Sequence, residues 1–160
     1  MILRDLRPDD WPSVRAIYEE GLRGGDATFE TEPPSWEAWA AAHPELRLVA
    51  ERDGSVVGWA ALSPASSRDC YRGVGEVSVY VAEEARGAGL GRELLERLVE
   101  RSEQMGYWTL TAGVFRENEA SLGLHRACGF REVGVRERIG ESNGVWRDVI
   151  WLERRSTRVG

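Results

Sequence analysis

One stretch of the chain, Gly75 to Leu98, runs through a strand pattern, a glycine-rich loop and a helix pattern without a break. Valine stands at positions 77, 79 and 81 and alternates with Glu76, Ser78 and Tyr80, which is the period of a half-buried strand. Apolar residues then recur at helical spacing, at Leu90, Leu94, Leu95, Leu98 and Val99. A strand-loop-helix unit of this kind requires a fold that combines a sheet with helices.

The loop of this unit reads Arg86-Gly87-Ala88-Gly89-Leu90-Gly91-Arg92. Three glycines at a helix start cost conformational entropy, which favours a function for them. Free backbone N–H groups and the helix dipole at such a place attract an anion such as phosphate. A purely structural glycine-rich helix start is the alternative. A Walker loop is excluded because Arg92 follows Gly91, and the GxGxxG dinucleotide spacing is absent.

The amino-acid composition limits which molecules the protein could bind. The net charge of −6 argues against nucleic acid and anionic membranes, which attract basic surfaces. A polyanionic cofactor would therefore depend on local arginines and backbone amides. All 21 basic residues are arginine, which excludes a lysine Schiff base.

The cysteines and histidines give no metal or redox pattern. Cys70 and Cys128 lie far apart in sequence, and His43 and His125 are the only histidines, so we expect no metal site. The N-terminus lacks the apolar run of a signal peptide, and no run of about eighteen apolar residues occurs. These features predict a soluble, cytoplasmic protein.

The whole chain reads as one α+β domain over residues 1–155 with a frayed tail over 156–160. Expected strands cover 1–6, 47–52, 55–62, 76–81, 107–114, 130–139 and 146–152, and expected helices cover 10–24, 35–43, 89–105 and 118–128. Hairpin signals at Asp53-Gly54 and Asn143-Gly144 predict a mostly antiparallel, twisted sheet of about seven strands with about four helices. The irregular stretch 63–74 is expected to border the active cleft.

Motifs along nearly the whole chain resemble the GNAT superfamily of N-acetyltransferases, in its phosphinothricin and methionine sulfoximine branch. The matching residues are Ala27-Thr28-Phe29-Glu30, Ser63-Pro64, Arg68, Tyr71-Arg72, Glu76, Val79-Tyr80-Val81, Arg86 to Gly91, Asn118, Ser121, Leu124-His125, Gly129-Phe130 and Gly144 to Val149. The resemblance implies the GNAT fold and transfer of an acetyl group from acetyl-CoA to a small primary amine. It also implies a homodimer.

The resemblance further implies how acetyl-CoA is bound. Backbone groups of Val79, Tyr80 and Val81 would hold the pantetheine arm and the thioester carbonyl. The loop residues Arg86, Gly87, Ala88, Gly89, Leu90, Gly91 and Arg92 would hold the pyrophosphate. Asn118 and Ser121 would contact the arm from the opposite wall, although Asn118 is equally suited to be an ordinary helix N-cap.

Two residues are candidates for the chemistry. A protonated amine cannot attack a thioester, so a base must take a proton, and the resemblance assigns this role to Glu76. Without the resemblance, Glu76 would be read as a solvated strand residue. His125 stands where many relatives carry a tyrosine acid, and a hydrogen-bonded core histidine is the alternative. A backbone N–H around Val79 to Val81 would stabilise the oxyanion.

The resemblance also predicts a substrate with a carboxylate beside its amine. Arg68 would bind that group, with Tyr71 as a hydroxyl donor and Phe29 as an apolar wall; a solvated loop arginine is the alternative for Arg68. Ser66 and Ser142 replace cations usual in the branch, which weakens the case for phosphinothricin and favours methionine sulfoximine or sulfone. Two other functions stay open: an acetyl-CoA sensor without turnover, and an acetyltransferase for protein N-termini or polyamines.

Overall fold

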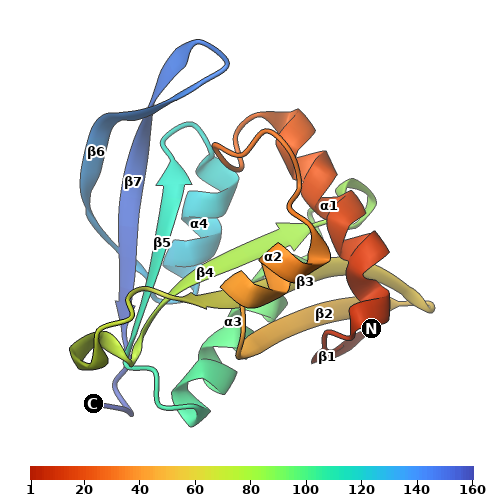
Figure 1. Cartoon of the computed structure of the whole chain (residues 1–160), viewed down its shortest axis with the longest axis horizontal. Coiled ribbons are helices and arrows are strands. Elements are labelled where there is room, and N and C mark those ends of the chain that lie inside the picture. Colours follow the sequence, from red (N-terminus) through yellow and green to blue (C-terminus); the bar gives the residue numbers. More distant parts are fainter.

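A computed structural model describes all residues of the chain, 1–160. Its elements follow the order shown in Figure 1. The strands are β1 (Ile2–Asp5), β2 (Leu46–Arg52), β3 (Ser55–Pro64), β4 (Val74–Val81), β5 (Thr109–Phe115), β6 (Arg131–Ser142) and β7 (Val145–Arg155). The α-helices are α1 (Trp11–Gly24), α2 (Trp36–Ala42), α3 (Leu90–Gln104) and α4 (Glu119–Ala127), and three short 3-10 turns accompany them: η1 (Pro8–Asp10), η2 (Asp69–Tyr71) and η3 (Glu83–Ala85).

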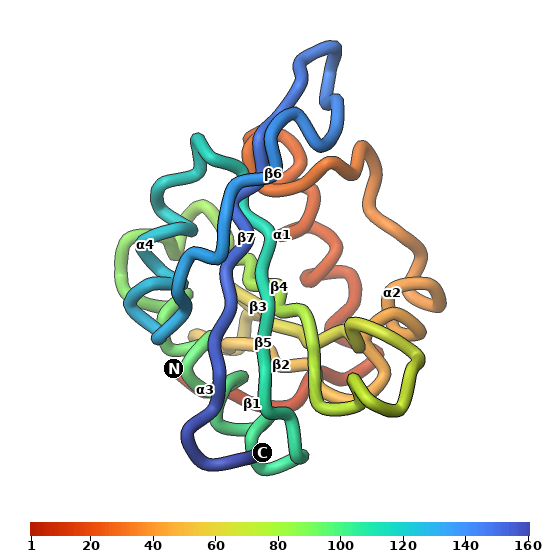
Figure 2. Tube along the Cα trace, turned by 90° about the vertical axis from the view of Figure 1, so that its left-hand side faces the viewer, coloured from red at the N-terminus to blue at the C-terminus, as the bar shows by residue number.

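The seven strands form one sheet in the order β1-β2-β3-β4-β5-β7-β6. Every neighbouring pair is antiparallel except β4 and β5, which run parallel. This confirms the predicted α+β class and its mostly antiparallel sheet of about seven strands. Figure 1 shows β5, β7 and β6 upright on one side of the molecule. In Figure 2 the same strands run upright through the middle of the view, and the β6–β7 hairpin rises above the rest.

Helices cover both faces of the β1–β4 half. The Trp59 ring on β3 stacks at 6.2 Å on Tyr18 of α1. Its neighbour Gly58 faces the other way, and a Cβ there would lie 2.9 Å from Leu94 of α3. Successive strand residues point to opposite faces, so α1 and α3 lie on opposite sides of the sheet. Burial on both faces explains why Val57 to Leu62 are all buried.

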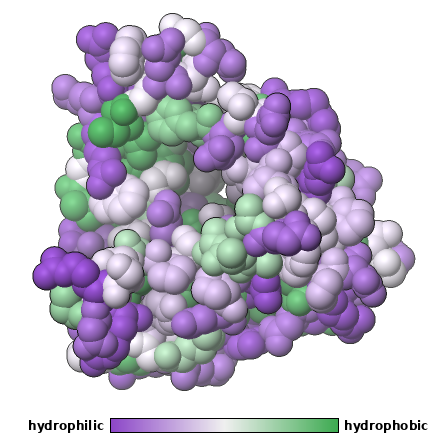
Figure 3. Space-filling model, in the orientation of Figure 1, coloured by the Kyte–Doolittle hydropathy of each residue, from purple (hydrophilic) through white to green (hydrophobic).

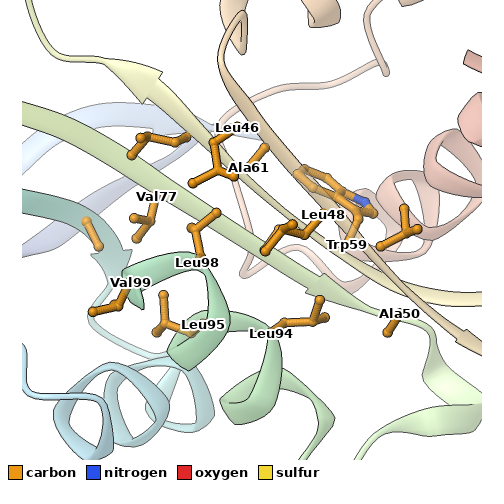
Figure 4. Close-up of a cluster of buried hydrophobic side chains, with 14 of the residues drawn as sticks. Leu46, Leu48, Ala50, Trp59, Ala61, Val77, Leu94, Leu95, Leu98 and Val99 are labelled. Atoms are coloured by element: carbon orange, nitrogen blue, oxygen red, sulfur yellow. The ribbon is translucent and has the colours of Figure 1, made fainter. Parts of the chain in front are cut away.

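The apolar stripe predicted for the helix after the glycine loop is confirmed. Leu90, Leu94, Leu95, Leu98 and Val99 are all buried on α3. Figure 4 shows leucines of α3 pointing toward strand side chains such as Leu48 and Val77. This packing fixes the start of α3, and with it the glycine loop, against the end of β4.

The C-terminal part differs from the expectation in two respects. The strands β6 and β7 are each longer than predicted, and they form the raised hairpin in Figure 1. Residues 156–160, for which the sequence predicts a frayed tail, fold back against the chain. Ser156 Oγ donates to Glu103, and the Arg155 side chain donates to the carbonyls of Val159 and Gly160. No helix has both the length and the apolar character needed to cross a membrane.

Candidate active site

The sheet opens beside Glu76. The strands β4 and β5 pair at three positions only, Val74 with Thr109, Gly75 with Leu110 and Glu76 with Thr111. Beyond Glu76 the strands diverge, so the edge of β4 that faces β5 has no strand partner there. A cleft of about 860 Å³ occupies this opening, and Figure 3 shows it as a hollow in the surface.

Several parts of the chain meet around the cleft. They include the end of α1, β4 from Glu76 to Val81, the glycine loop with the start of α3, β5 from Ala112 to Phe115, α4 with its N-cap, and the segment Asp26 to Phe29. The raised hairpin adds Arg136, Ile139, Val149 and Trp151. The cleft therefore joins the loop expected to bind an anion to the residue expected to act as a base.

Two glycines of the loop adopt a conformation that other residues avoid. Gly87 and Gly89 both have φ of +82°, and Gly89 is the N-cap of α3. No side chain caps this helix, so its first N–H groups remain free for a ligand. The Arg86 side chain folds back and donates from Nε to the Val81 carbonyl at 3.1 Å. The loop thus has the uncapped amides that a pyrophosphate group requires.

The other four residues of the loop differ in their surroundings. Leu90 is buried, and Ala88 is exposed outside the cleft lining. A Cβ on Gly91 would lie 3.3 Å from Leu124 of α4, so glycine here lets α3 approach α4 closely. Arg92 forms an i,i+4 ion pair with Glu96 at 2.8 Å.

Asn118 and Ser121 lie on the opposite wall of the cleft, as expected. Asn118 is the N-cap of α4, because its Oδ1 accepts the N–H of Ser121 at 3.1 Å. Its Nδ2 donates to the Asp26 carbonyl at 3.0 Å, which ties α4 to the segment after α1. The capping role is therefore present, and it leaves the cofactor-binding role of both residues a prediction.

Glu76 faces the cleft at the point where β4 and β5 separate. Glu76 is exposed at the cleft, and neighbouring chain atoms remove only part of the solvent around its carboxyl. This partial loss of solvent raises the pKa of the carboxyl above the ordinary value of 4.5, and the positive charge of Arg136 partly offsets the rise. A carboxylate with a raised pKa is a stronger base than an ordinary glutamate. These properties suit proton abstraction from an amine.

His125 also lines the cleft, from the buried face of α4. Its Nδ1 lies 2.7 Å from the Ser121 carbonyl, which can only accept, so Nδ1 carries the proton. Burial lowers the pKa of the imidazole below 6.5, so the ring is neutral at neutral pH with a lone pair on Nε2. The Phe130 ring packs edge-on against it at 5.2 Å. The ring is therefore neutral and carries no proton on Nε2, so it is poorly suited to act as a general acid.

The three residues predicted to bind substrate separate into two places. Phe29 lines the cleft, where it meets the Phe115 ring edge-on at 4.6 Å. Arg68 and Tyr71 belong to the exposed stretch around η2 and are not among the lining residues. The Arg68 guanidinium instead lies 5.5 Å from the Tyr71 ring. The stretch 63–74 does not border this cleft.

Many residues of the cleft lining were not predicted from the sequence as site residues, and four of them are Gly113, Arg136, Ile139 and Trp151. Gly113 leaves space, since a Cβ there would lie 3.1 Å from the Trp151 ring. All four lie on β5, β6 or β7, whose approach to β4 depends on the overall sheet order. Their sequence pattern carries no local sign of a binding role.

The geometry fits acetyl-CoA, the co-substrate implied by the resemblance. The opening beside β4 offers an unpaired strand edge, the glycine loop offers uncapped amides, and Glu76 stands at the narrow end of the opening. No group of three or more His, Cys, Asp or Glu side chains is arranged to hold a metal ion.

Known proteins resemble this chain over most of its length. A phosphinothricin N-acetyltransferase of Alcaligenes faecalis is 40% identical over 159 residues, which cover 95% of this chain and 81% of that protein. An L-methionine sulfoximine/L-methionine sulfone acetyltransferase of Pseudomonas paraeruginosa is 31% identical over 158 residues, covering 94% and 92%. A crystal structure of a GNAT superfamily phosphinothricin acetyltransferase from Sinorhizobium meliloti in complex with AcCoA superimposes with a TM-score of 0.89 at 34% identity, covering 96% of this chain and 87% of that one.

The assignment to a family follows from a match to a family model that spans most of the chain. The model of the acetyltransferase (GNAT) family matches residues 4–130, which include β4, the glycine loop, α3 and α4. The chain therefore belongs to the GNAT family and is an acetyl-CoA-dependent N-acetyltransferase.

Proposed function

We propose that this chain acetylates the primary amine of a small amino-acid-like substrate of the phosphinothricin or methionine sulfoximine type. One observation carries the proposal: Glu76 lies at the last paired position of β4 and β5, in the same cleft as the uncapped glycine loop. Relatives named for these two substrates, 40% and 31% identical, support the substrate class.

In the proposed mechanism, acetyl-CoA supplies a thioester carbonyl that an amine can attack. Glu76 takes a proton from the amine, directly or through water, because only the unprotonated amine is a nucleophile. A backbone N–H from Val79 to Val81 donates to the carbonyl oxygen as negative charge develops on it. The new C–N bond forms, the C–S bond breaks, and the thiolate leaves and takes up a proton.

The residues to which we assign binding roles all lie in or beside the same cleft. Backbone groups of Val79, Tyr80 and Val81 hold the pantetheine arm, and amides from Gly87 to Arg92 hold the pyrophosphate. Asn118 and Ser121 form the opposite wall. Phe29 is the apolar wall for the substrate. Because burial favours the neutral His125 ring and the Ser121 carbonyl fixes its tautomer, we assign it an orienting role second to Glu76.

The function is tested by measuring thiol release from acetyl-CoA against a panel of amines. The panel holds phosphinothricin, methionine sulfoximine, methionine sulfone, spermidine and a peptide with a free N-terminus. We expect release with one or more of the amino-acid analogues and little with the others. Release only with spermidine or the peptide would favour the alternative acetyltransferases, and no release with retained acetyl-CoA binding would favour a sensor.

We further propose that the chain acts as a homodimer in the cytoplasm. The raised hairpin exposes several large apolar side chains, which a second copy would cover: Val133, Val135, Ile139, Val145 and Trp146. Both cysteines are free, which suits a reducing compartment. Light scattering on the purified chain tests the dimer, and a monomer mass at micromolar concentration would contradict it.

A further inference from the structure

The strand β6 carries a bulge directly after Arg136. Arg136 pairs with Val149 of β7, and the next pair is Gly140 with Arg147. Three residues of β6, 137–139, therefore stand opposite Asp148 alone. The Asp148 carboxylate anchors this bulge, because its Oδ1 accepts the Arg138 N–H at 2.8 Å and its Oδ2 pairs with Arg116 at 2.9 Å.

The bulge changes which side chains reach the cleft. In a regular strand, residues 136 and 139 would point to opposite faces of the sheet. Here both Arg136 and Ile139 line the cleft, and Gly140 packs closely under Phe29. Bulges commonly redirect a side chain in this way beside a functional site. The bulge thus puts both a guanidinium and an apolar side chain into the lining of the cleft.

The Arg136 side chain forms no close ion pair within the chain, although its positive charge acts on the Glu76 carboxyl at longer range. It makes no hydrogen bond or ion pair, whereas the other arginines of the cleft, Arg86 and Arg92, are held by the Val81 carbonyl and by Glu96. Its Cζ lies 4.3 Å from the centre of the Trp151 ring. Packing against an aromatic ring restrains the guanidinium while leaving its N–H groups free for a ligand.

The charges at this end of the cleft match a zwitterion. Glu76 supplies a carboxylate and Arg136 a guanidinium, and both line the same cleft. An α-amino acid presents an amine and a carboxylate a few bonds apart, so it can face both side chains at once. Arg68, the arginine expected to bind the carboxylate, lies outside the lining residues.

We propose that Arg136 binds the carboxylate of the amine substrate and so selects amines that carry an anionic group next to the reacting nitrogen. This inference rests on the proposed function. A planar guanidinium binds a carboxylate through two parallel hydrogen bonds, which fixes the orientation of the substrate as well as its affinity. The amine would then be directed toward Glu76.

The test compares two acceptors that differ only in the carboxylate: methionine sulfone and methionine sulfone amide. Their kcat/KM values are measured for the wild type and for Arg136→Met, at one pH, so that the difference in amine pKa cancels in the ratio. We expect Arg136→Met to lower kcat/KM for the acid about tenfold to a hundredfold, mainly through KM, and for the amide less than about threefold. Arg136→Gln is expected to behave in the same way.

Arg138→Met is the matched control, because Arg138 lies on the same bulge but stacks on the exposed Trp146 at 5.4 Å. It should leave the preference for the acid unchanged. Acetyl-CoA affinity and melting temperature of the Arg136 variants should stay at the wild-type values, which shows that the cleft is intact.

Three outcomes would overturn the inference: an equal loss for acid and amide, an unchanged preference in both Arg136 variants, or loss of the preference in Arg68→Met instead. Failure of the proposed function gives a different result, because then neither acceptor would be acetylated by the wild type.

Discussion

Glu76 and Thr111 form the last residue pair between β4 and β5, and the cleft opens immediately beyond them. This places the carboxylate at the narrow end of the opening, where the two strands are still held together. A base in that position is fixed by the sheet rather than by a loop. The pairing explains how Glu76, which the strand pattern alone does not mark as functional, can act as a base in the cleft.

The first prediction concerns the relative importance of Glu76 and His125. If Glu76 takes the proton, Glu76→Ala should lower kcat about a hundredfold or more, the range typical of general-base catalysis. His125→Ala should lower kcat much less, because that ring is neutral and hydrogen-bonded to Ser121. Steady-state kinetics on both purified variants decides the matter. A larger loss in His125→Ala would reverse the two roles.

The second prediction concerns pH. Glu76 must be ionised to act, and loss of solvent raises its pKa above 4.5, so kcat/KM should fall as pH drops through this raised pKa. Arg136 lowers the pKa of the same carboxyl, so Arg136→Met should raise that pKa further. The acidic bend in a pH profile measured with methionine sulfone amide should therefore move to higher pH. A bend that stays in place or moves to lower pH would exclude this coupling.

The glycine loop and the α3 stripe were accessible from the sequence because both depend on local patterns. The spacing of leucines alone predicted the buried face of α3, and hairpin signals predicted the antiparallel ends of the sheet. The raised hairpin shows the limit of such patterns. Nothing near Arg136 or Trp151 indicates that β7 pairs with β5 and brings both residues to the cleft.

The stretch around Arg68 shows a second limit of prediction from the sequence. It leads directly into β4, and nearness in sequence suggested that it borders the cleft. In the structure it joins β3 and β4 at the Pro64–Gly75 end of their pairing, whereas the cleft begins at Glu76 and extends toward Val81. Strand direction, which residue patterns do not give, decides which end of β4 a connection reaches.

The third prediction tests the conformation of the glycine loop. Gly89 has φ of +82°, where alanine costs about 1–2 kcal/mol. Relief of that strain would move the amides at the start of α3, so Gly89→Ala should raise the Kd for acetyl-CoA about tenfold in calorimetry. Gly54 has φ of +80° in the turn between β2 and β3, far from the cleft lining, so Gly54→Ala should carry similar strain with no change in Kd. Equal Kd values in the two variants would exclude a role for the loop amides.

The fourth prediction concerns Arg147, which ties the hairpin to the cleft wall. Its guanidinium donates to the Gly25 carbonyl at 3.0 Å, to Asp26 at 2.7 Å and to Glu117 at 3.2 Å, and its side chain is only 12% exposed. Arg147→Met removes three hydrogen bonds of a nearly buried guanidinium, although the Asp26 and Glu117 carboxylates stay in contact with water, and should cost about 1.5 kcal/mol of unfolding free energy. The amine KM should also rise, because the tethered segment carries Phe29.

The control for Arg147 is Arg131→Met on the same hairpin. Arg131 forms an ion pair with Glu153 and its side chain is 65% exposed, so this variant should lose less than about 1 kcal/mol. Urea unfolding of both variants gives the comparison. Equal losses would mean that the three contacts of Arg147 contribute no more than an exposed pair.

The most direct measurement is a calorimetric titration of acetyl-CoA into the purified wild-type chain. The opening between β4 and β5 and the uncapped amides of the glycine loop predict saturable heat with one molecule bound per chain. A folded chain that gives no saturable heat would contradict the assignment of this cleft to acetyl-CoA.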